Sequence, residues 1–541
     1  MSNAPHDALV EKLIGDHVVR RIWERDPSVW NAPDESTAGA IRNRLGWIDA
    51  PRMMRTHLDR LRALAAEVRK ERLSAVYLLG MGGSSLCAEV LRSVYGVAPG
   101  FPDLFVLDTT DEETLTGAAS RLEPSGSLFI VASKSGTTIE VSSMERFFWK
   151  LMEEALGDRA GRHFVGITDP GTALQTLAQS RGYRAVFINP PDIGGRFSAL
   201  SLFGLVPASV VGAPVDDFLH GGSMMADGCR QERHTNAGLE LGAFMGASAA
   251  DGRDKLTVLL PHGLASLGLW IEQLIAESTG KLGRGILPVV DEPAVNITGK
   301  VGSALYGPDR AFVAVETESD RLDEGMLDAL GSAGHPVLRI RSRRAALGAE
   351  FFRWEFATAL AGAVLNVNPF DEPNVTEAKD RTKALLASFE REGRLPEEPP
   401  ANAVQVGELI ASLRERDYLA VLSYLPPESA TQGVIDELRA AVRSRGGHAT
   451  TRGIGPRYLH STGQYHKGGP DTGVFLMLTA DDRTATQIPD APYTFSILKR
   501  AQALGDQQAL AAHGRRVARV HLSGNNHAEG LQQLFARALS S

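Results

Sequence analysis

Polar segments able to bind an anion follow two apolar runs of the chain. The segment SKSGTT (133–138) places four hydroxyl side chains around one glycine, directly before a predicted helix. Hydroxyls and the free backbone amides at a helix start both donate hydrogen bonds to a phosphate. Since one hydroxyl is enough to cap a helix, the surplus favours a phosphate site over capping alone. The segment GMGGSS (80–85) is a second candidate, although any strand-to-helix turn uses glycines in this way.

Two further segments carry groups that suit proton transfer next to a carbonyl. In QLIAESTGK (273–281), Gln273 and Glu277 are four residues apart and share a helix face. Apolar neighbours raise the basicity of a carboxylate, which suits a base that removes a carbon-bound proton. In DIGGRFS (192–198), two glycines present Arg196, a cation able to stabilise a developing oxyanion. The alternatives without a catalytic role are that Glu277 is an exposed glutamate near a helix end and that Arg196 is a surface arginine in a tight turn.

Segments nearer the carboxyl terminus add lysine and histidine candidates. NPFDEPNVTEAK (368–379) starts a helix with an acidic cap and a proline in its first turn, and it ends at Lys379. A helical lysine is normally solvated, and Lys383 is the natural comparison. HSTGQYHKGGP (460–470) is dense in proton-carrying groups, which indicates either a functional loop or structural histidines held by hydrogen bonds.

Short runs that are apolar throughout precede most of these segments, as expected of parallel strands covered by helices on both faces. In the first half of the chain the runs are AVYLLG (75–80), LFVLDT (104–109), SLFIVAS (127–133), FVGITD (164–169) and AVFINP (185–190). Further along they are LTVLLP (256–261), AFVAVE (311–316), VLRIRS (337–342), YLAVLSYL (418–425), VFLMLTA (474–480) and VARVHLS (517–523). Ligands of open parallel sheets bind beyond the carboxyl ends of the strands, where the candidate loops are expected.

The pattern predicts an α/β protein with two doubly wound parallel-sheet domains. An amino-terminal helical segment (1–72) precedes a first α/β domain (73–235) and a second one (236–395). The polar, proline-rich stretch EGRLPEEPPAN (392–402) is typical of a linker. An α/β region (403–541) follows, and we expect it to complete the second domain.

Composition and charge exclude several classes of function. The chain has 57 basic and 65 acidic residues, and the resulting charge of -8 argues against a nucleic-acid or anionic-membrane partner. Cys87 and Cys229 form neither a disulfide framework nor a CxxC pair, which favours a reducing cytoplasm. No secretion signal is recognisable, and no apolar stretch approaches the ~20 residues of a membrane span.

Nucleotide and metal cofactors are not expected. Ser85 stands where the third glycine of a GxGxxG dinucleotide motif would follow Gly80 and Gly82. Neither Gly280-Lys281 nor Gly299-Lys300 continues into the hydroxyl residue of a P-loop. The anion is therefore expected to be the phosphate of a small substrate.

Taken together, the motifs resemble those of the glucose-6-phosphate isomerase family, whose two domains share the sugar isomerase (SIS) fold. The matching segments occur in order over residues 75 to 380: GMGGSS, SKSGTT, DIGGRFS, QLIAESTGK and NPFDEPNVTEAK. WERDPSVW near the start and LHSTGQYHKGGP are most similar to the isomerase half of bacterial transaldolase and isomerase fusions. No transaldolase half is present in this sequence.

The resemblance implies a role for each matching residue. Glu277 would be the base, Arg196 the clamp on an enediolate, and Lys379 a partner in ring opening. The substrate would be held by Ser133, Ser135 and Thr138 at its phosphate, with Gly83, Ser84 and Gln273 nearby.

The sequence departs from the family pattern at two places. Glu372 and Pro373 stand where the family has glutamine and tryptophan. The family's ring-opening histidine follows a GQH motif between the glutamate and lysine motifs, and this interval holds only His335. STGQYH, after the lysine, is the nearest look-alike, so His466 takes the role and His460 is the reserve.

The resemblance implies reversible interconversion of glucose 6-phosphate and fructose 6-phosphate in glycolysis and gluconeogenesis, without a cofactor, and it suggests a homodimer. One alternative is a non-catalytic sugar-phosphate sensor, which would keep the 133–138 loop but would not need Glu277 or Arg196. Mannose 6-phosphate as a further substrate also stays open.

Overall fold

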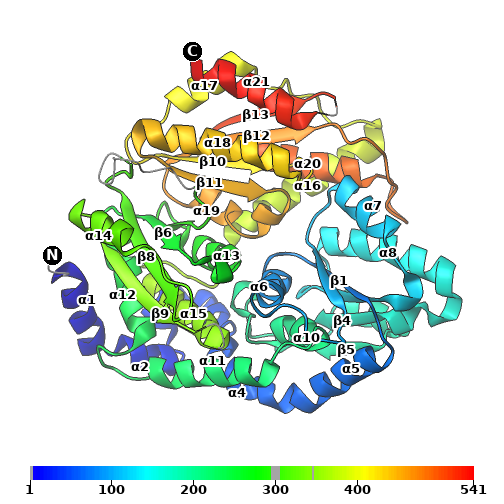
Figure 1. Ribbon diagram of the computed structural model, residues 1–541, viewed down its shortest axis with the longest axis horizontal. Helices are drawn as coiled ribbons and strands as arrows, with labels where there is room; N and C mark the ends of the chain where they lie inside the picture. The colour runs from blue at the N-terminus through cyan, green and yellow to red at the C-terminus, as the bar shows by residue number, and fades with distance from the viewer. Residues whose placement is uncertain (1–3, 294–304, 344–345, 525, 541) are drawn as a thin grey trace.

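The computed structural model describes residues 4–293, 305–343, 346–524 and 526–540, which form three parallel β-sheets with helices around them (Figure 1). Gly299 and Lys300 lie outside the described residues. Within the described ranges, no helix is both long and apolar enough to cross a membrane. The α/β class predicted from the apolar runs is confirmed by these sheets.

The amino-terminal segment is helical and packs beneath the first two sheets (Figure 1). Its helices are α1 (Ala4–Gly15), α2 (Val18–Trp23), α3 (Glu35–Arg42), α4 (Ala50–Met53) and α5 (Leu58–Lys70). The indole Nε1 of Trp30 donates to the carbonyl of Ala359 at 2.7 Å, and the Trp47 ring packs against Phe197 and Phe352. These tryptophans therefore serve packing, because they join the segment to both α/β layers.

The first sheet has five parallel strands in the order β2-β1-β3-β4-β5. The strands are β1 (Ala75–Gly80), β2 (Asp103–Leu107), β3 (Ser127–Ala132), β4 (Phe164–Thr168) and β5 (Ala185–Ile188). The helices are α6 (Leu86–Tyr95), α7 (Glu112–Ser120), α8 (Ile139–Leu156), α9 (Ala173–Ser180) and α10 (Leu202–Val210). The central strand β3 is buried along its whole length, and the rings of Tyr77, Phe129 and Phe164 stack across three neighbouring strands.

The second sheet has four parallel strands in the order β7-β6-β8-β9. The strands are β6 (Lys255–Leu259), β7 (Leu287–Val289), β8 (Arg310–Thr317) and β9 (Val337–Ser342). The helices around it are α11 (Val215–Cys229), α12 (Ala237–Ala250), α13 (Leu267–Thr279), α14 (Glu324–Ser332) and α15 (Leu347–Val364). The next helix, α16 (Pro373–Glu392), packs instead against α20 (Phe495–Ala512), further along the chain. Helices α12 and α15 are buried on most sides, since one apolar cluster continues through them from the first sheet into the second.

Residues 403–541 form a third sheet, in the order β11-β10-β12-β13, that is hydrogen-bonded separately from the second. Its strands are β10 (Tyr418–Ser423), β11 (Ala449–Ile454), β12 (Gly473–Ala480) and β13 (Arg516–Leu522). Its helices are α17 (Ala403–Ala411), α18 (Ser429–Gly446), α19 (Gly463–Gly468), α20 (Phe495–Ala512) and α21 (His527–Ser540). Asn402 and Gln405 form a capping box that starts α17 directly after the proline-rich stretch.

The third sheet packs against the edge of the second. An apolar cluster joins Leu287 and Val289 of β7 to Tyr418 and Phe475 of β10 and β12. The division of the chain into domains stays a prediction. The contact nevertheless shows that residues 403–541 share a core with the second sheet.

Two strands were not predicted from the sequence. Strand β7 has only three residues and contains Pro288, and β11 reads ATTRGI, with few apolar side chains. Both lie at sheet edges, where they pair on one side only, so neither needs a continuous apolar run.

Candidate active site

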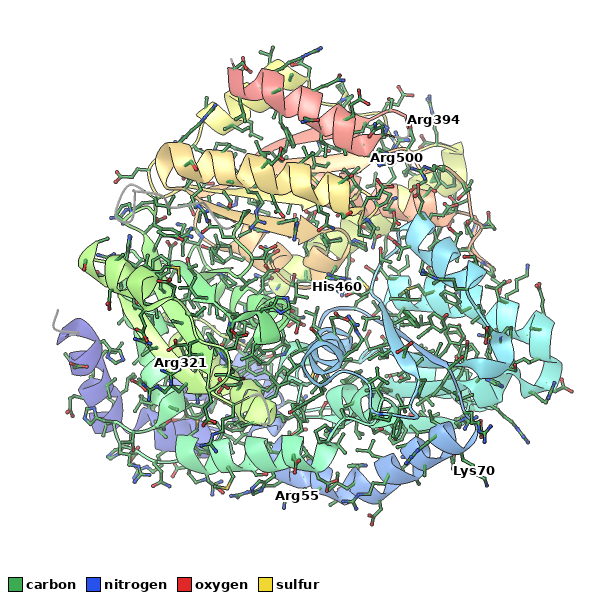
Figure 2. All side chains as sticks on the ribbon, viewed as in Figure 1. Arg55, Lys70, Arg321, Arg394, His460 and Arg500 are labelled. Carbon is green, nitrogen blue, oxygen red and sulfur yellow. The ribbon has the colours of Figure 1, made fainter. Side chains whose placement is uncertain are left out.

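A pocket opens between the first sheet, helix α16 and the third sheet, and Figure 2 shows His460, one of its lining residues, near the centre of the molecule. Its empty volume is about 670 Å³, including the open mouth. The loop after β3 and the start of α8 form one wall, with Ser135, Thr137, Thr138 and Glu140. The other walls come from α16 and from the third sheet, with Lys379, Thr382, Lys383, His460 and Gln502.

The hydroxyl-rich loop keeps its fold through its own side chains. Gly136 has a φ of 67°, and a side chain there would meet Thr172, so only glycine fits the turn. The buried hydroxyl of Ser133 accepts from the amide of Gly136 at 3.1 Å and lies 3.0 Å from the hydroxyl of Thr138. Ser133 therefore shapes the loop, while Ser135 and Thr137 are exposed and line the pocket.

The glycine loop after β1 packs against the other site segments and does not line the pocket. A Cβ on Gly83 would lie 2.0 Å from the carbonyl of Gly195, and one on Gly82 would lie 2.7 Å from the amide of Gln273. Ser84 sits in the same turn, half-buried. The glycines thus allow this loop to touch the Arg196 turn and the Glu277 helix.

Glu277 and Gln273 project from the same face of α13, as their spacing predicts. The amide Nε2 of Gln273 donates to Glu277 Oε2 at 3.0 Å and to the carbonyl of His460 at 2.8 Å. This link joins the carboxylate to the pocket wall. Burial raises the pKa of the Glu277 carboxyl; Arg196 opposes the rise and the negative charge of Glu372 adds to it, so the pKa stays above its usual value.

Arg196 is a buried hub between the first and second sheets. Its Nη1 lies 3.0 Å from carboxylate oxygens of both Glu277 and Glu372. Its Nε donates to the Ser278 hydroxyl at 2.8 Å, and Nη2 donates to the carbonyls of Pro369 and Asp371 at 2.7 and 2.8 Å. The guanidinium therefore fixes the position of Glu277 and supplies positive charge directly beside it.

His460 pairs with a buried carboxylate that the sequence did not single out. Its Nε2 lies 2.9 Å from Oε1 of Glu140, in the first turn of α8. Burial raises the pKa of the Glu140 carboxyl, but the charge and hydrogen bond of His460, with help from Lys379, bring it below the usual value. Glu140 is thus an ionised partner whose carboxylate oxygen can accept a hydrogen bond from the His460 ring.

Comparison with known proteins shows which family the chain belongs to. A family model described as phosphoglucose isomerase matches residues 50–307. A glucose-6-phosphate isomerase from Rubrobacter xylanophilus is 30% identical over 389 residues, which cover 63% of this chain and 89% of that protein. The chain belongs to the phosphoglucose isomerase family.

Solved structures of similar proteins show the same fold. A hypothetical protein from Thermus thermophilus is 26% identical, with a TM-score of 0.58 over 70% of this chain and 97% of that one. A glucose-6-phosphate isomerase from Chlamydia trachomatis is 19% identical, with a TM-score of 0.51 over 69% of this chain and 78% of that one. The sugar isomerase fold implied by the sequence motifs is thereby confirmed.

His466, the histidine preferred from the family pattern, does not line the pocket. Its side chain is buried on the far side of α19, where Nδ1 lies 2.9 Å from the Tyr418 hydroxyl and the ring packs against Phe475. Burial, followed by the charges of Lys467 and Arg515, lowers its pKa well below the usual value. His466 is therefore a neutral core residue, and the reserve candidate His460 is the histidine in the pocket.

Three polar residues that line the pocket were not singled out from the sequence: Glu140, Thr382 and Gln502. Glu140 directly follows the hydroxyl-rich loop of the phosphoglucose isomerase motif, so an acidic residue at a predicted site was a usable signal. Gln502 lies in the middle of a long helix about 40 residues after His460, and nothing in its local sequence marks it.

Proposed function

We propose that this chain interconverts glucose 6-phosphate and fructose 6-phosphate through a cis-enediolate, with Glu277 as the base. The observation that carries the proposal is the short hydrogen-bonded path from Glu277 through Gln273 to His460, which stands beside the hydroxyl-rich loop. A base, a proton carrier and a phosphate-binding loop are the parts that a cofactor-independent sugar isomerase needs.

The phosphate binds at the loop after β3. The exposed hydroxyls of Ser135 and Thr137, with Thr138 at the start of α8, donate to it, and Lys379 and Lys383 supply positive charge across the pocket. The loop keeps this shape without a ligand because Ser133 and Gly136 hold it.

Ring opening needs a proton delivered to the ring oxygen and another removed from the hydroxyl on carbon 1. The Nε2 of His460 is held by Glu140, which leaves Nδ1 to exchange a proton with the sugar. Lys379, on the same pocket wall, is the second group placed to assist.

Isomerisation then moves one proton between two carbons. Glu277 removes the proton from carbon 2 and the electrons form the enediolate. The hydroxyl proton passes from oxygen 2 to oxygen 1, and the protonated carboxyl returns its proton to carbon 1. Arg196 lies 3.0 Å from Glu277, and its positive charge stabilises the negative charge that develops on the enediolate oxygens.

Isotope exchange tests the proposal. We expect the protein to convert glucose 6-phosphate to fructose 6-phosphate and, in deuterated water, to introduce deuterium at carbon 2, measured by nuclear magnetic resonance. A sugar-phosphate sensor would bind the same substrate in calorimetry without any exchange, and that outcome would overturn the proposal. Formation of deuterated mannose 6-phosphate in the same reaction would show that carbon 2 of the enediolate is also protonated on its opposite face.

Replacing His460 with asparagine should lower kcat on cyclic glucose 6-phosphate by about 10²-fold or more, because a proton carrier is lost. The phosphate loop is untouched, so binding of the substrate in calorimetry should change little. The matched control is His466→Asn, which removes the core histidine six residues further along the chain. We expect this control to lower the melting temperature and to leave kcat within a few-fold of the wild type; the opposite ranking of the two variants would reject His460.

A further inference from the structure

Gln502, on helix α20 of the third sheet, reaches across to the first sheet and contacts the carboxylate that holds His460. Its Nε2 donates to Oε1 of Glu140 at 2.8 Å, the same oxygen that lies 2.9 Å from His460 Nε2. Gln502 and Glu140 are both nearly inaccessible, at 2% and 3% exposed. One buried carboxylate oxygen therefore accepts from the amide and from the histidine together.

A second contact fixes which way the Gln502 amide faces. The hydroxyl of Thr110, which is fully buried just after β2, donates to Gln502 Oε1 at 2.8 Å. A carboxylate accepts hydrogen bonds but has none to donate, so the NH₂ group must face Glu140 and the carbonyl oxygen must face Thr110. The result is a chain of hydrogen bonds from Thr110 through Gln502 and Glu140 to His460.

Helix α20 is itself tied to the first sheet one turn before Gln502. Lys499 pairs with Asp111 at 2.9 Å, and the Ser496 hydroxyl donates to Glu112. Both acceptors lie at the start of α7, immediately after Thr110. On the next turn, Gly505 packs closely against Thr382 of α16, which lines the pocket. Gln502 is thus presented to Glu140 by a helix that cannot easily shift.

We infer that Gln502 is a positioning residue for ring opening: through its hydrogen bond it holds the Glu140 carboxylate in the orientation that grips His460. This inference rests on the proposed function. Gln502 positions the proton carrier His460 through Glu140, whereas the phosphate loop and Glu277 are held by other contacts. Its loss should therefore slow ring opening more than it weakens substrate binding.

Gln502→Met and Thr110→Val test the inference, since both roughly keep side-chain volume; the first removes both hydrogen bonds of Gln502, and the second removes only the one from Thr110. We expect Gln502→Met to slow the exchange between the two anomers of glucose 6-phosphate, measured by magnetisation transfer, by about 10-fold to 100-fold. KM should stay within a few-fold. Loss of a donor to Glu140 raises the pKa of that carboxyl, so the acid limb of the anomer-exchange rate should move to higher pH. Thr110→Val should act in the same direction with a smaller loss, and Thr110→Ser should restore the rate.

Gln502→Glu gives an outcome that a merely structural role would not produce. The introduced carboxyl repels Glu140 when ionised and donates a hydrogen bond to it when protonated, so the rate relative to wild type should rise as the pH falls. If circular dichroism shows that Gln502→Met is unfolded, the Thr110→Val and Gln502→Glu variants test the inference instead. Wild-type anomer exchange and an unmoved pH profile in the folded variants overturn the role of Gln502. Absence of isomerisation in the wild-type protein overturns the proposed function, which is a separate result.

Discussion

Replacing Glu277 with glutamine is expected to lower kcat for isomerisation by about 10⁴-fold, the upper range for loss of a general base. The amide keeps the shape of the side chain, and its single oxygen can still accept from either Arg196 or Gln273, so the fold should persist. Exchange between the anomers of glucose 6-phosphate should survive, because His460 and Glu140 are unchanged. Stopped-flow kinetics, deuterium exchange at carbon 2 and magnetisation transfer measure the three steps separately.

The pH dependence of the same reaction provides an independent check on Glu277. A base must be ionised, and burial raises the pKa of this carboxyl above its ordinary value of 4.5. The acid limb of kcat/KM should therefore lie above pH 4.5, with activity lost as the pH falls through it. Glu372→Gln is the matched control, since it removes the negative charge that adds to this rise. Its acid limb should move to lower pH, and a limb unchanged in that variant would count against Glu277.

Replacing Arg196 with methionine is expected to reduce both stability and activity. Removing one partner of a buried ion pair typically costs about 3–5 kcal/mol, because the remaining charge is left without compensation. Here two carboxylates, Glu277 and Glu372, would face each other without the cation that lies 3.0 Å from each. Loss of the charge that stabilises the enediolate should lower kcat by a further ~10²-fold to 10³-fold. Thermal unfolding and steady-state kinetics measure the two effects.

Two other variants separate the two roles of Arg196. Arg196→Lys keeps the charge but loses the fork of donors to Ser278 and Pro369, so it should recover more stability than activity. Arg62→Met removes an arginine that also contacts two carboxylates, Asp59 at 3.0 Å and Asp216 at 2.6 Å, but at the surface. We expect a much smaller loss of stability there, because exposed ion pairs contribute little. Equal losses at the two sites would contradict the role given to burial.

Much of this fold could be predicted because its parallel strands are apolar on both faces. Strand β3 reads SLFIVA and is buried throughout, and the hydroxyl-rich loop follows it as expected. Strands β7 and β11 were missed, since a three-residue strand and a polar edge strand leave no such pattern. The third sheet was recognised as α/β, but its separate hydrogen bonding depends on pairing between distant segments, which the apolar pattern alone does not encode.

Candidate site residues could be predicted from the sequence where they directly follow a strand. They could not be predicted where their position depends on tertiary packing. Glu277 and Gln273 were found because their spacing places them on one helix face. His466 was preferred to His460 because it lies in the GQH look-alike, and the sequence does not reveal that the six-residue helix α19 turns His466 toward Tyr418. The pairing of Glu140 with His460 spans 320 positions of sequence and appears only in the folded chain.

The late position of His460 and Gln502 in the chain has a consequence for synthesis in the cell. A ribosome completes the first two sheets, with Glu277, Arg196 and the hydroxyl-rich loop, before it has translated either residue. Until then Glu140 lacks the hydrogen bonds of both side chains. On the proposed mechanism, the nascent polypeptide can therefore assemble its base early, but it gains the group that opens the sugar ring only when the last sheet docks.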